Sequence, residues 1–427
     1  MIEHLFEVDP EASEKKLRIL VEHLEELKSK AAAAQARATA LWAAKRAAAE
    51  QAAGLAAKRR GKGLASEIAL ARHDAPVKGN QHLGFANALV YEMPYTLAAL
   101  EAGVLSECRA TLIVRESACL SRQDRQQLDT ELCADPARLV GWGDRRVAAE
   151  AAKITARLDA AAVVERNTKA VKDRHVTTRP APNGMVYVTF LMPLTQGIGM
   201  YAALKRGADM NGDGRSQGQF MCDTAYERVT GRSATVPVDV SLNLVMADTT
   251  LAGDDTEPAW LDGYGPIPAG FACQLTGDAV ADKDAKATLR RLYRHPRSGQ
   301  LVAMESRSRT FPKGLATLIR VRDRTCRTPY CNAPIRHLDH ATPDRGGGKT
   351  SAVNGLGVCE ACNYAKEAPG WRVSTSMRDG AHHAEFLTPT GARYHSLAPP
   401  LPGVPVRQKI SLVEGQLSID LVTFEAA

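Results

Sequence analysis

Two closely spaced cysteine pairs near the C-terminus hold four of the nine cysteines of this 427-residue chain. The first pair is Cys326 and Cys331, and the second pair is Cys359 and Cys362. Two short loops of this kind can supply four thiolates to one tetrahedral Zn²⁺. Four protein ligands leave no open coordination position, so we expect a structural ion that replaces the apolar core a small segment cannot build.

Polar residues between and beside the cysteine pairs suit hydrolytic chemistry. Asp339 and His340 are expected at the end of a strand, facing Asn363 at the start of a helix. A carboxylate and an amide oxygen suit a hard cation such as Mg²⁺ or Mn²⁺, and His340 can take a proton from an attacking water near neutral pH. These residues predict metal-assisted hydrolysis of a phosphodiester. The expected elements are strands over 335–340 and 356–358 and a helix over 362–367.

The charge of the chain permits a polyanionic partner, and its distribution indicates where that partner would bind. The formal net charge is only +7, from 55 Lys and Arg against 48 Asp and Glu. The segment 320–372 is locally basic, with nine Lys and Arg against five Asp and Glu. DNA binding through such residues should weaken steeply with salt. The candidate phosphate contacts are Arg322, Arg324, Arg327, Arg345, Lys349 and Lys366.

The stretch from Val321 to Val373 resembles the HNH endonucleases, or ββα-metal nucleases, and is most similar to those whose zinc is held by two cysteine pairs. The resemblance implies that Asp339 is a metal ligand and His340 the general base. It also implies that Asn354 holds the catalytic loop in place and that Asn363 is the second metal ligand.

The wider chain, from about Leu64 to Gly403, resembles a bacterial subgroup called the thirteen-E-twelve repeat family, in which a helical domain of unknown function precedes a C-terminal HNH domain. Cys362-Asn363 stands where the subgroup more often has two histidines, and Glu367 stands where it has a histidine. Glu367 would weaken contact with DNA through like-charge repulsion. The matching segments are Thr96–Gly103, Gly265–Pro268, Arg322–Arg327, Gly370–Val373 and Thr388–Gly391.

The expected fold class is a mainly α N-terminal region, a mixed α+β middle region and a small zinc-stabilised ββα-metal (HNH) module near the C-terminus. The helical and strand patterns divide the chain accordingly. The expected domains are a helical arm over 1–62, a helical bundle over 63–174, an α+β region over 175–313, the HNH module over 314–376, and a hairpin with a C-terminal tail over 377–427.

The first sixty residues are rich in Ala, Glu, Lys and Leu, with apolar residues spaced three or four apart from Leu17 to Leu27. This pattern predicts a long helix that either packs on a neighbour or forms a homodimer, and packing is the favoured interpretation. Helices around 66–71 and 83–89 have the order of a helix-turn-helix. A packing scaffold is again the favoured interpretation of that pair.

Several observations limit the remaining interpretations. The chain shows neither a signal-peptide pattern after Met1 nor an apolar run long enough to span a membrane, so a cytoplasmic protein is expected. Beyond Trp371, His382 and His383 are expected on the surface of a hairpin. The alternative function is a catalytically silent zinc-containing DNA-binding protein, which would retain DNA without cutting it. The remaining cysteines are given no role: Cys108, Cys119, Cys133, Cys222 and Cys273.

Overall fold

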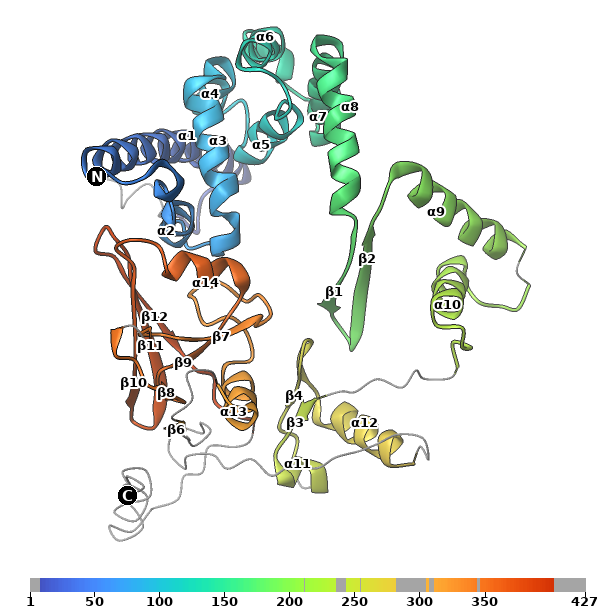
Figure 1. Cartoon of the computed structure of the whole chain (residues 1–427). Helices are drawn as coiled ribbons and strands as arrows, with labels where there is room; N and C mark the ends of the chain where they lie inside the picture. The colour runs from blue at the N-terminus through green and yellow to red at the C-terminus, as the bar shows by residue number, and fades with distance from the viewer. Residues whose placement is uncertain are drawn as a thin grey trace.

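The computed structural model describes residues 8–210, 212–235, 243–253, 255–281, 305–306, 311–343 and 346–402. Within these ranges the chain combines helices with small sheets, and helices predominate in its N-terminal half (Figure 1). No helix in the described ranges is long and apolar enough to cross a bilayer. The fold class is therefore mixed, with the cysteine pairs in the C-terminal part.

A 39-residue helix, α1 (Glu14–Ala52), begins the described chain, and its first turn is capped by the Ser13 hydroxyl. One face of α1 packs on α3 (Gly79–Tyr91) and α4 (Pro94–Glu101). That face is made of small side chains, which allow the helices to approach closely. The prediction of a long helix packed on a neighbour is confirmed for this face. The buried residues are Ser29, Ala32, Ala33, Ala36, Thr39 and Ala40.

Five further α-helices complete the N-terminal region, and short 3₁₀ turns connect some of them. The apolar faces of α5, α6 and α7 share one core with α1, α3 and α4, in which Leu89, Leu100, Ile113 and Leu128 are fully buried. Helix α2 packs instead on the C-terminal part through Leu70, and α8 has no buried residue. The prediction that this region is built of helices is confirmed. The helices are α2 (Leu64–Ala71), α5 (Glu107–Glu116), α6 (Arg122–Cys133), α7 (Asp144–Leu158) and α8 (Ala160–Ala170).

The corner between α2 and α3 lies against the C-terminal part of the chain. Its 3₁₀ turn (Pro76–Lys78) contacts α14 (Glu360–Lys366). The two helices also approach each other closely, because a Cβ on Gly79 would lie 1.8 Å from the Ala65 carbonyl oxygen. This contact favours the packing-scaffold interpretation over a helix that reads DNA.

The middle region is a series of small units. The sequence predicts strands over 176–179 and 185–191, joined by a turn over 180–184, and this hairpin is confirmed as β1 (His175–Ala181) paired antiparallel with β2 (Met185–Leu191). The alternating residues 236–244 predict a further strand. Most of them, 236–242, lie outside the described residues, and the end of the stretch is β3 (Leu244–Val245). The other elements are α9 (Leu194–Asp209), α10 (Gln217–Thr230), α11 (Asp248–Ala252), β4 (Ala259–Leu261), β5 (Gly265–Ile267) and α12 (Ala269–Ala281).

Among its described residues, the C-terminal part has two helices and three small sheets (Figure 1). Helix α13 (Lys313–Asp323) leads into the first cysteine pair, and α14 contains the end of the second. The hairpin predicted beyond Trp371 is confirmed and gains a third strand. The strand pairs are β6 (Glu305–Ser306) with β8 (Thr350–Ser351), β7 (His337–His340) with β9 (Gly355–Val358), and β10 (Arg372–Arg378) with β11 (Ala381–Leu387) and then β12 (Arg393–Leu397).

The N-terminal bundle and the C-terminal part share a buried polar contact. Glu67 in α2 is 1% exposed, and its carboxylate accepts hydrogen bonds from the backbone N–H and the hydroxyl of Thr390. Its second oxygen forms an ion pair with Arg46 at 2.8 Å. Beside it, Gly63 packs so closely on Trp371 that an added Cβ would lie 2.6 Å from the indole nitrogen. The two parts of the chain therefore meet through specific, close-fitting contacts.

Candidate functional site

The four cysteines of the two pairs come together as predicted. Their Sγ atoms all lie within 4.8 Å of one another, and those of Cys331 and Cys359 are 3.8 Å apart. A tetrahedral zinc with Zn–S bonds of about 2.3 Å separates its sulfurs by about 3.8 Å. All four side chains are buried. The cluster could therefore hold a structural metal such as zinc.

The electrostatics of the cluster also favour a bound cation. A hydrogen bond with the Cys331 thiol lowers the pKa of Cys326 to about 7. Hydrogen bonds with the neighbouring cysteines raise the pKa of Cys331 and Cys362. Four sulfurs at this separation repel one another once they are ionised. A divalent cation removes that repulsion, which makes the set of four thiolates suited to metal binding.

A strand-strand-helix arrangement surrounds the cluster. Strands β7 and β9 pair antiparallel, with His340 opposite Gly355. Cys359 is the N-cap residue of α14, so the cluster fixes the start of this helix against the strands. The predicted strands and helix are found with shifts of one or two residues at their ends. The segment between β7 and β9 contains the short strand β8.

The Asp339 carboxylate faces α14 and binds the side chain of Lys366. The Lys366 Nζ lies 2.8 Å from Asp339 Oδ2, and the backbone N–H of His340 donates to Oδ1 at 2.8 Å. Burial raises the pKa of Asp339, but the hydrogen bond and charge of Lys366 outweigh it, so the pKa lies below its ordinary value. Asp339 is thus ionised at neutral pH, and each of its oxygens keeps a lone pair for another ligand.

The His340 ring is held by two neighbours. The Thr350 hydroxyl lies 2.9 Å from Nε2, and the Phe311 ring packs against the imidazole with centroids 4.7 Å apart. The other nitrogen, Nδ1, lies 3.8 Å from Asp339 Oδ1, which is too long for a hydrogen bond. The ring orientation is therefore fixed through Nε2. His340 is 8% exposed, so any water at Nδ1 would be bound at a nearly closed site.

Asn363 lies in α14, and its spacing from Lys366 indicates which side of the helix it occupies. It precedes Lys366 by three residues, and side chains three apart share a helix face. Since Lys366 contacts Asp339, this spacing places Asn363 on the same side of the helix as the carboxylate. Its Oδ1 atom is buried and has no hydrogen-bond partner among the described residues. A buried amide oxygen without a partner is costly, so this atom is available to accept from a water or to bind a cation.

Asn354 ties together the two ends of the loop between β7 and β9. Its Oδ1 accepts from the Thr342 N–H, and its Nδ2 donates to the carbonyls of Thr342 and Lys349, each at 2.9 Å. Gly348 makes this closure possible, because an added Cβ would lie 1.8 Å from the Thr342 oxygen. Asn354 thus ties together the residues that follow β7 and those that precede it in the loop.

The predicted phosphate contacts divide into internal and exposed residues. Arg322, Arg327 and Lys366 are buried in ion pairs. The prediction that these three residues contact phosphate is therefore replaced: they stabilise the inside of the module. Arg324 packs over the Trp260 ring and donates to the Pro400 carbonyl. Lys349 is exposed and stays a candidate. The sixth candidate, Arg345, lies outside the described residues.

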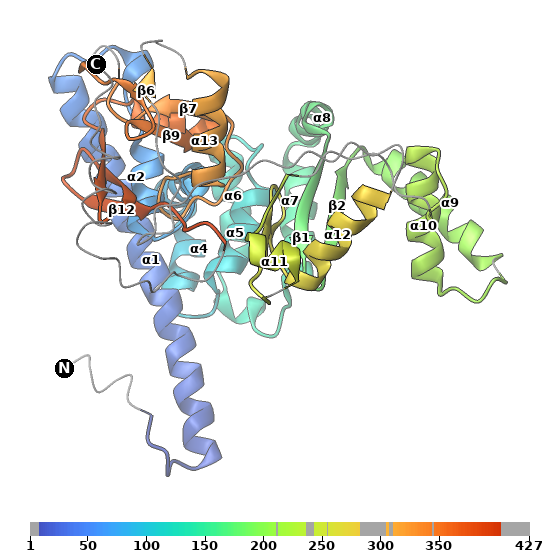
Figure 2. The same cartoon turned by 90° about the horizontal axis from the view of Figure 1, so that it is seen from below.

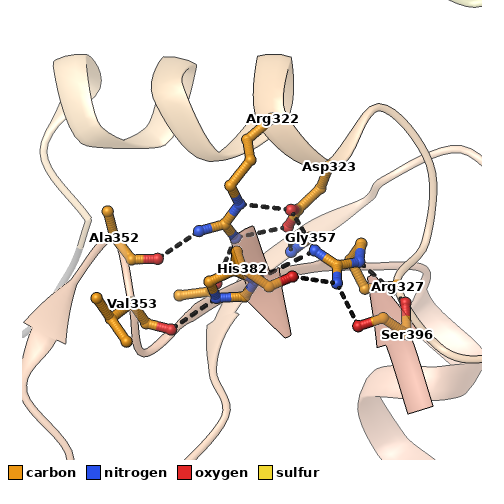
Figure 3. A network of polar contacts seen from close by, with 9 residues as sticks. Arg322, Asp323, Arg327, Ala352, Val353, Gly357, His382 and Ser396 are labelled. Carbon is orange, nitrogen blue, oxygen red and sulfur yellow. Dashed lines mark hydrogen bonds and ion pairs between the residues drawn. The ribbon is translucent and has the colours of Figure 1, made fainter. Parts of the chain in front are cut away.

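A buried ionic network that the sequence did not reveal joins α13 to the strands (Figure 3). The fully buried Asp323 carboxylate lies between the Arg322 and Arg327 guanidinium groups and also accepts the Gly357 N–H at 2.7 Å. Arg322 donates to the carbonyl of Gly355 at 2.7 Å. The network therefore fixes the backbone of β9 at Gly355 and Gly357 and, with it, the strand that follows Asn354.

His382 is part of this network, so the expectation that it lies on the surface is wrong. The residue is fully buried, with Nε2 donating to the Val353 carbonyl at 2.8 Å and Nδ1 near the Arg327 guanidinium at 3.2 Å. It points inward because β11 alternates and His382 belongs to the same buried series as Phe386. His383 points the other way and is partly exposed.

The burial of His382 predicts a pH-dependent stability. Burial, followed by the charge of Arg322, lowers the pKa of His382 from 6.5 to about 3. Below about pH 6.5 the unfolded chain binds a proton that the folded chain does not. The stability that neutral His382 contributes is therefore complete above that pH and is lost as the pH falls toward 3, by up to about 1.4 kcal/mol per pH unit.

Urea unfolding measured from pH 7 to pH 4 tests this expectation. Replacing His382→Gln should flatten the pH dependence of the free energy of unfolding relative to the unchanged chain. The matched control is His383→Gln, on the same strand but partly exposed, which should leave the slope unchanged. Equal slopes for the His382→Gln variant and the unchanged chain would contradict the expectation.

Comparison of the chain with models of known protein families, with curated proteins and with solved structures finds no match.

Proposed function

We propose that this protein is a metal-dependent endonuclease of the HNH type that hydrolyses DNA phosphodiester bonds. The observation that supports the proposal most is the contact of Asp339, beside His340 in β7, with α14, the helix that carries Asn363 and begins at the cysteine cluster. Asp339 and Asn363 fit a hard cation, because the carboxylate is ionised and the amide oxygen is buried without a partner among the described residues. Zinc at the cysteines and Mg²⁺ or Mn²⁺ at Asp339 and Asn363 are the expected metals.

The residues divide the chemistry between them. His340 acts as the general base: Thr350 holds Nε2, and Nδ1 takes the proton from the attacking water. A divalent cation, when bound, would polarise the phosphate and stabilise the leaving oxygen. Asn354 keeps the loop after His340 closed, so the imidazole stays aligned with the phosphate. Lys366 keeps Asp339 ionised and oriented toward α14.

The alternative function, a catalytically silent zinc-containing DNA-binding protein, is favoured by a different observation. Lys366 is 3% exposed and already neutralises the Asp339 carboxylate, as a permanent structural ion pair would. The near-burial of His340 points the same way. In this alternative the cysteine cluster and the ionic network only stabilise a binding surface.

A nicking assay on supercoiled plasmid distinguishes the two functions. The nuclease proposal requires relaxed or linear product in Mg²⁺ or Mn²⁺ and none in EDTA. Each site would hydrolyse one strand, so a nicked circle is the expected first product. Retention of DNA in a gel shift, with no product in any divalent ion, would establish the binding protein instead.

A further inference from the structure

Helix α1 has a second apolar face, opposite the one that packs on the bundle. Ala31, Ala34 and Ala38 are exposed, and each precedes a buried alanine by two residues. Residues two apart lie about 200° apart around a helix, so the exposed and buried alanines are on opposite sides of α1. Figure 2 shows the N-terminal part of α1 projecting away from the rest of the chain. The outer face is therefore free of the bundle.

The residues of the outer face recur with the alternating three- and four-residue spacing of a heptad. Leu27 is 36% exposed and Leu41 is 57% exposed, while Leu17, Leu20 and Leu24 are partly exposed. The face has eight such side chains in all, and none of them belongs to a hydrophobic cluster of the described residues. Eight consecutive apolar positions with this spacing form the seam of a coiled coil. The eight positions, called the outer seam below, are Leu17, Leu20, Leu24, Leu27, Ala31, Ala34, Ala38 and Leu41.

We propose that the outer seam binds the outer seam of a second copy of this chain, with the two α1 helices antiparallel. The order of side-chain sizes determines the direction. In an antiparallel pair centred near Ser29, Leu20 faces Ala38, Leu24 faces Ala34, and Leu27 faces Ala31 of the second copy. Large side chains then meet small ones in these six layers, as close packing requires, and Leu17 meets Leu41 in the layer at each end. A parallel pair in register would place alanine against alanine in three adjacent layers and leave the helices poorly packed there.

Charges and area are compatible with this pairing. Lys28 and Lys30 flank the centre of the seam, where two copies would bring like charges together. Each already has an ion pair on its own helix, Lys28 with Glu25 at 2.7 Å and Lys30 with Glu26 at 3.8 Å. A seam of this length buries on the order of 1,000 Å² in total, at the lower limit for specific association. The proposed dimer is therefore reversible and depends on concentration.

The β1–β2 hairpin is another exposed apolar surface of the described residues, and it provides a matched control. Val186 is 46% exposed and Val188 is 55% exposed. Its strands give no comparable self-complementary order of large and small residues. The same apolar-to-lysine change on the two surfaces therefore separates the proposed contact from a contact through the hairpin.

Sedimentation equilibrium of the full chain tests the proposal. The unchanged chain should approach twice its 46.0 kDa mass as concentration rises. The double variant Leu20→Lys, Leu24→Lys should stay monomeric, with a dissociation constant raised at least about 100-fold. The control Val186→Lys, Val188→Lys should associate like the unchanged chain. A monomeric unchanged chain at all concentrations, or loss of the dimer only in the control, would overturn the proposal.

Disulfide formation between two singly substituted chains tests the antiparallel direction. The exposed Cys108 and Cys222 are first replaced by serine. A mixture of Leu24→Cys and Ala34→Cys chains should form a mixed disulfide under mild oxidation, because facing seam positions lie within disulfide reach. Neither chain alone should cross-link. Cross-linking of the Leu24→Cys chain with itself would show a parallel pair and overturn the proposed arrangement.

Discussion

Replacing His340→Ala is expected to abolish the metal-dependent cleavage of plasmid DNA, while zinc content and DNA binding persist. Loss of a positioned general base lowers the rate by about 10²–10⁴-fold. The ring packs between Thr350 and Phe311 and is not a cysteine-cluster ligand, so the metal cluster should survive the change. The measurement is the initial rate of nicking in Mg²⁺, with zinc determined by elemental analysis.

His337 gives a matched control for this variant, because it lies at the other end of the same strand. His337→Ala should leave nicking close to that of the unchanged chain. A milder change, Thr350→Val, removes the partner of Nε2 and should lower the rate by about 10–100-fold without abolishing it. Unchanged cutting by His340→Ala, or equal losses from both histidine substitutions, would argue against the assigned general base.

Replacing Cys359→Ser is expected to release the metal and unfold the C-terminal module while the N-terminal bundle stays folded. Metal binding to structural zinc sites contributes about 10–16 kcal/mol in zinc-finger peptides, more than a module of this size can replace by burial. Cys359 also begins α14, so its loss frees the helix that presents Asn363 and Lys366. Limited proteolysis and zinc content report the two effects together.

Cys222→Ser is the control for the zinc prediction, because Cys222 is exposed and lies outside the cluster. It should keep both the metal and the protease resistance of the unchanged chain. The N-terminal bundle has its own core, so a resistant fragment containing α1 to α7 should remain after digestion of the Cys359→Ser variant. Retention of zinc by Cys359→Ser would show that the cluster does not hold the ion.

The sequence predicted the elements whose signals are local. The spacing of Cys326, Cys331, Cys359 and Cys362 was sufficient to predict a four-sulfur cluster, because each loop is short and positions its two thiols by itself. Periodicity likewise predicted α1 and the β1–β2 hairpin. These predictions needed no knowledge of how distant segments pack.

The parts of the site that were missed depend on contacts between segments far apart in the sequence. Arg322 and Arg327 were predicted to lie on a basic surface because they belong to a basic segment. Nothing nearby in the sequence shows that Asp323, the β9 backbone and His382 enclose them. For Lys366, the signal was present in its position three residues after Asn363, on the same face of α14. For His382, the alternation with Phe386 along β11 indicated burial. Neither pattern can be interpreted until the bounds of the helix and of the strand are known.

The contact between Glu67 and Thr390 has a consequence for synthesis on the ribosome. The bundle residues emerge first, and the partner of Glu67 lies 323 positions later, so it becomes available only after that length of chain has been translated. Until then the Glu67 carboxylate has only Arg46 to neutralise it, and the surface around Gly63 lacks Trp371. The nascent bundle thus presents an unfilled docking surface, which is completed once Trp371 and Thr390 have left the exit tunnel.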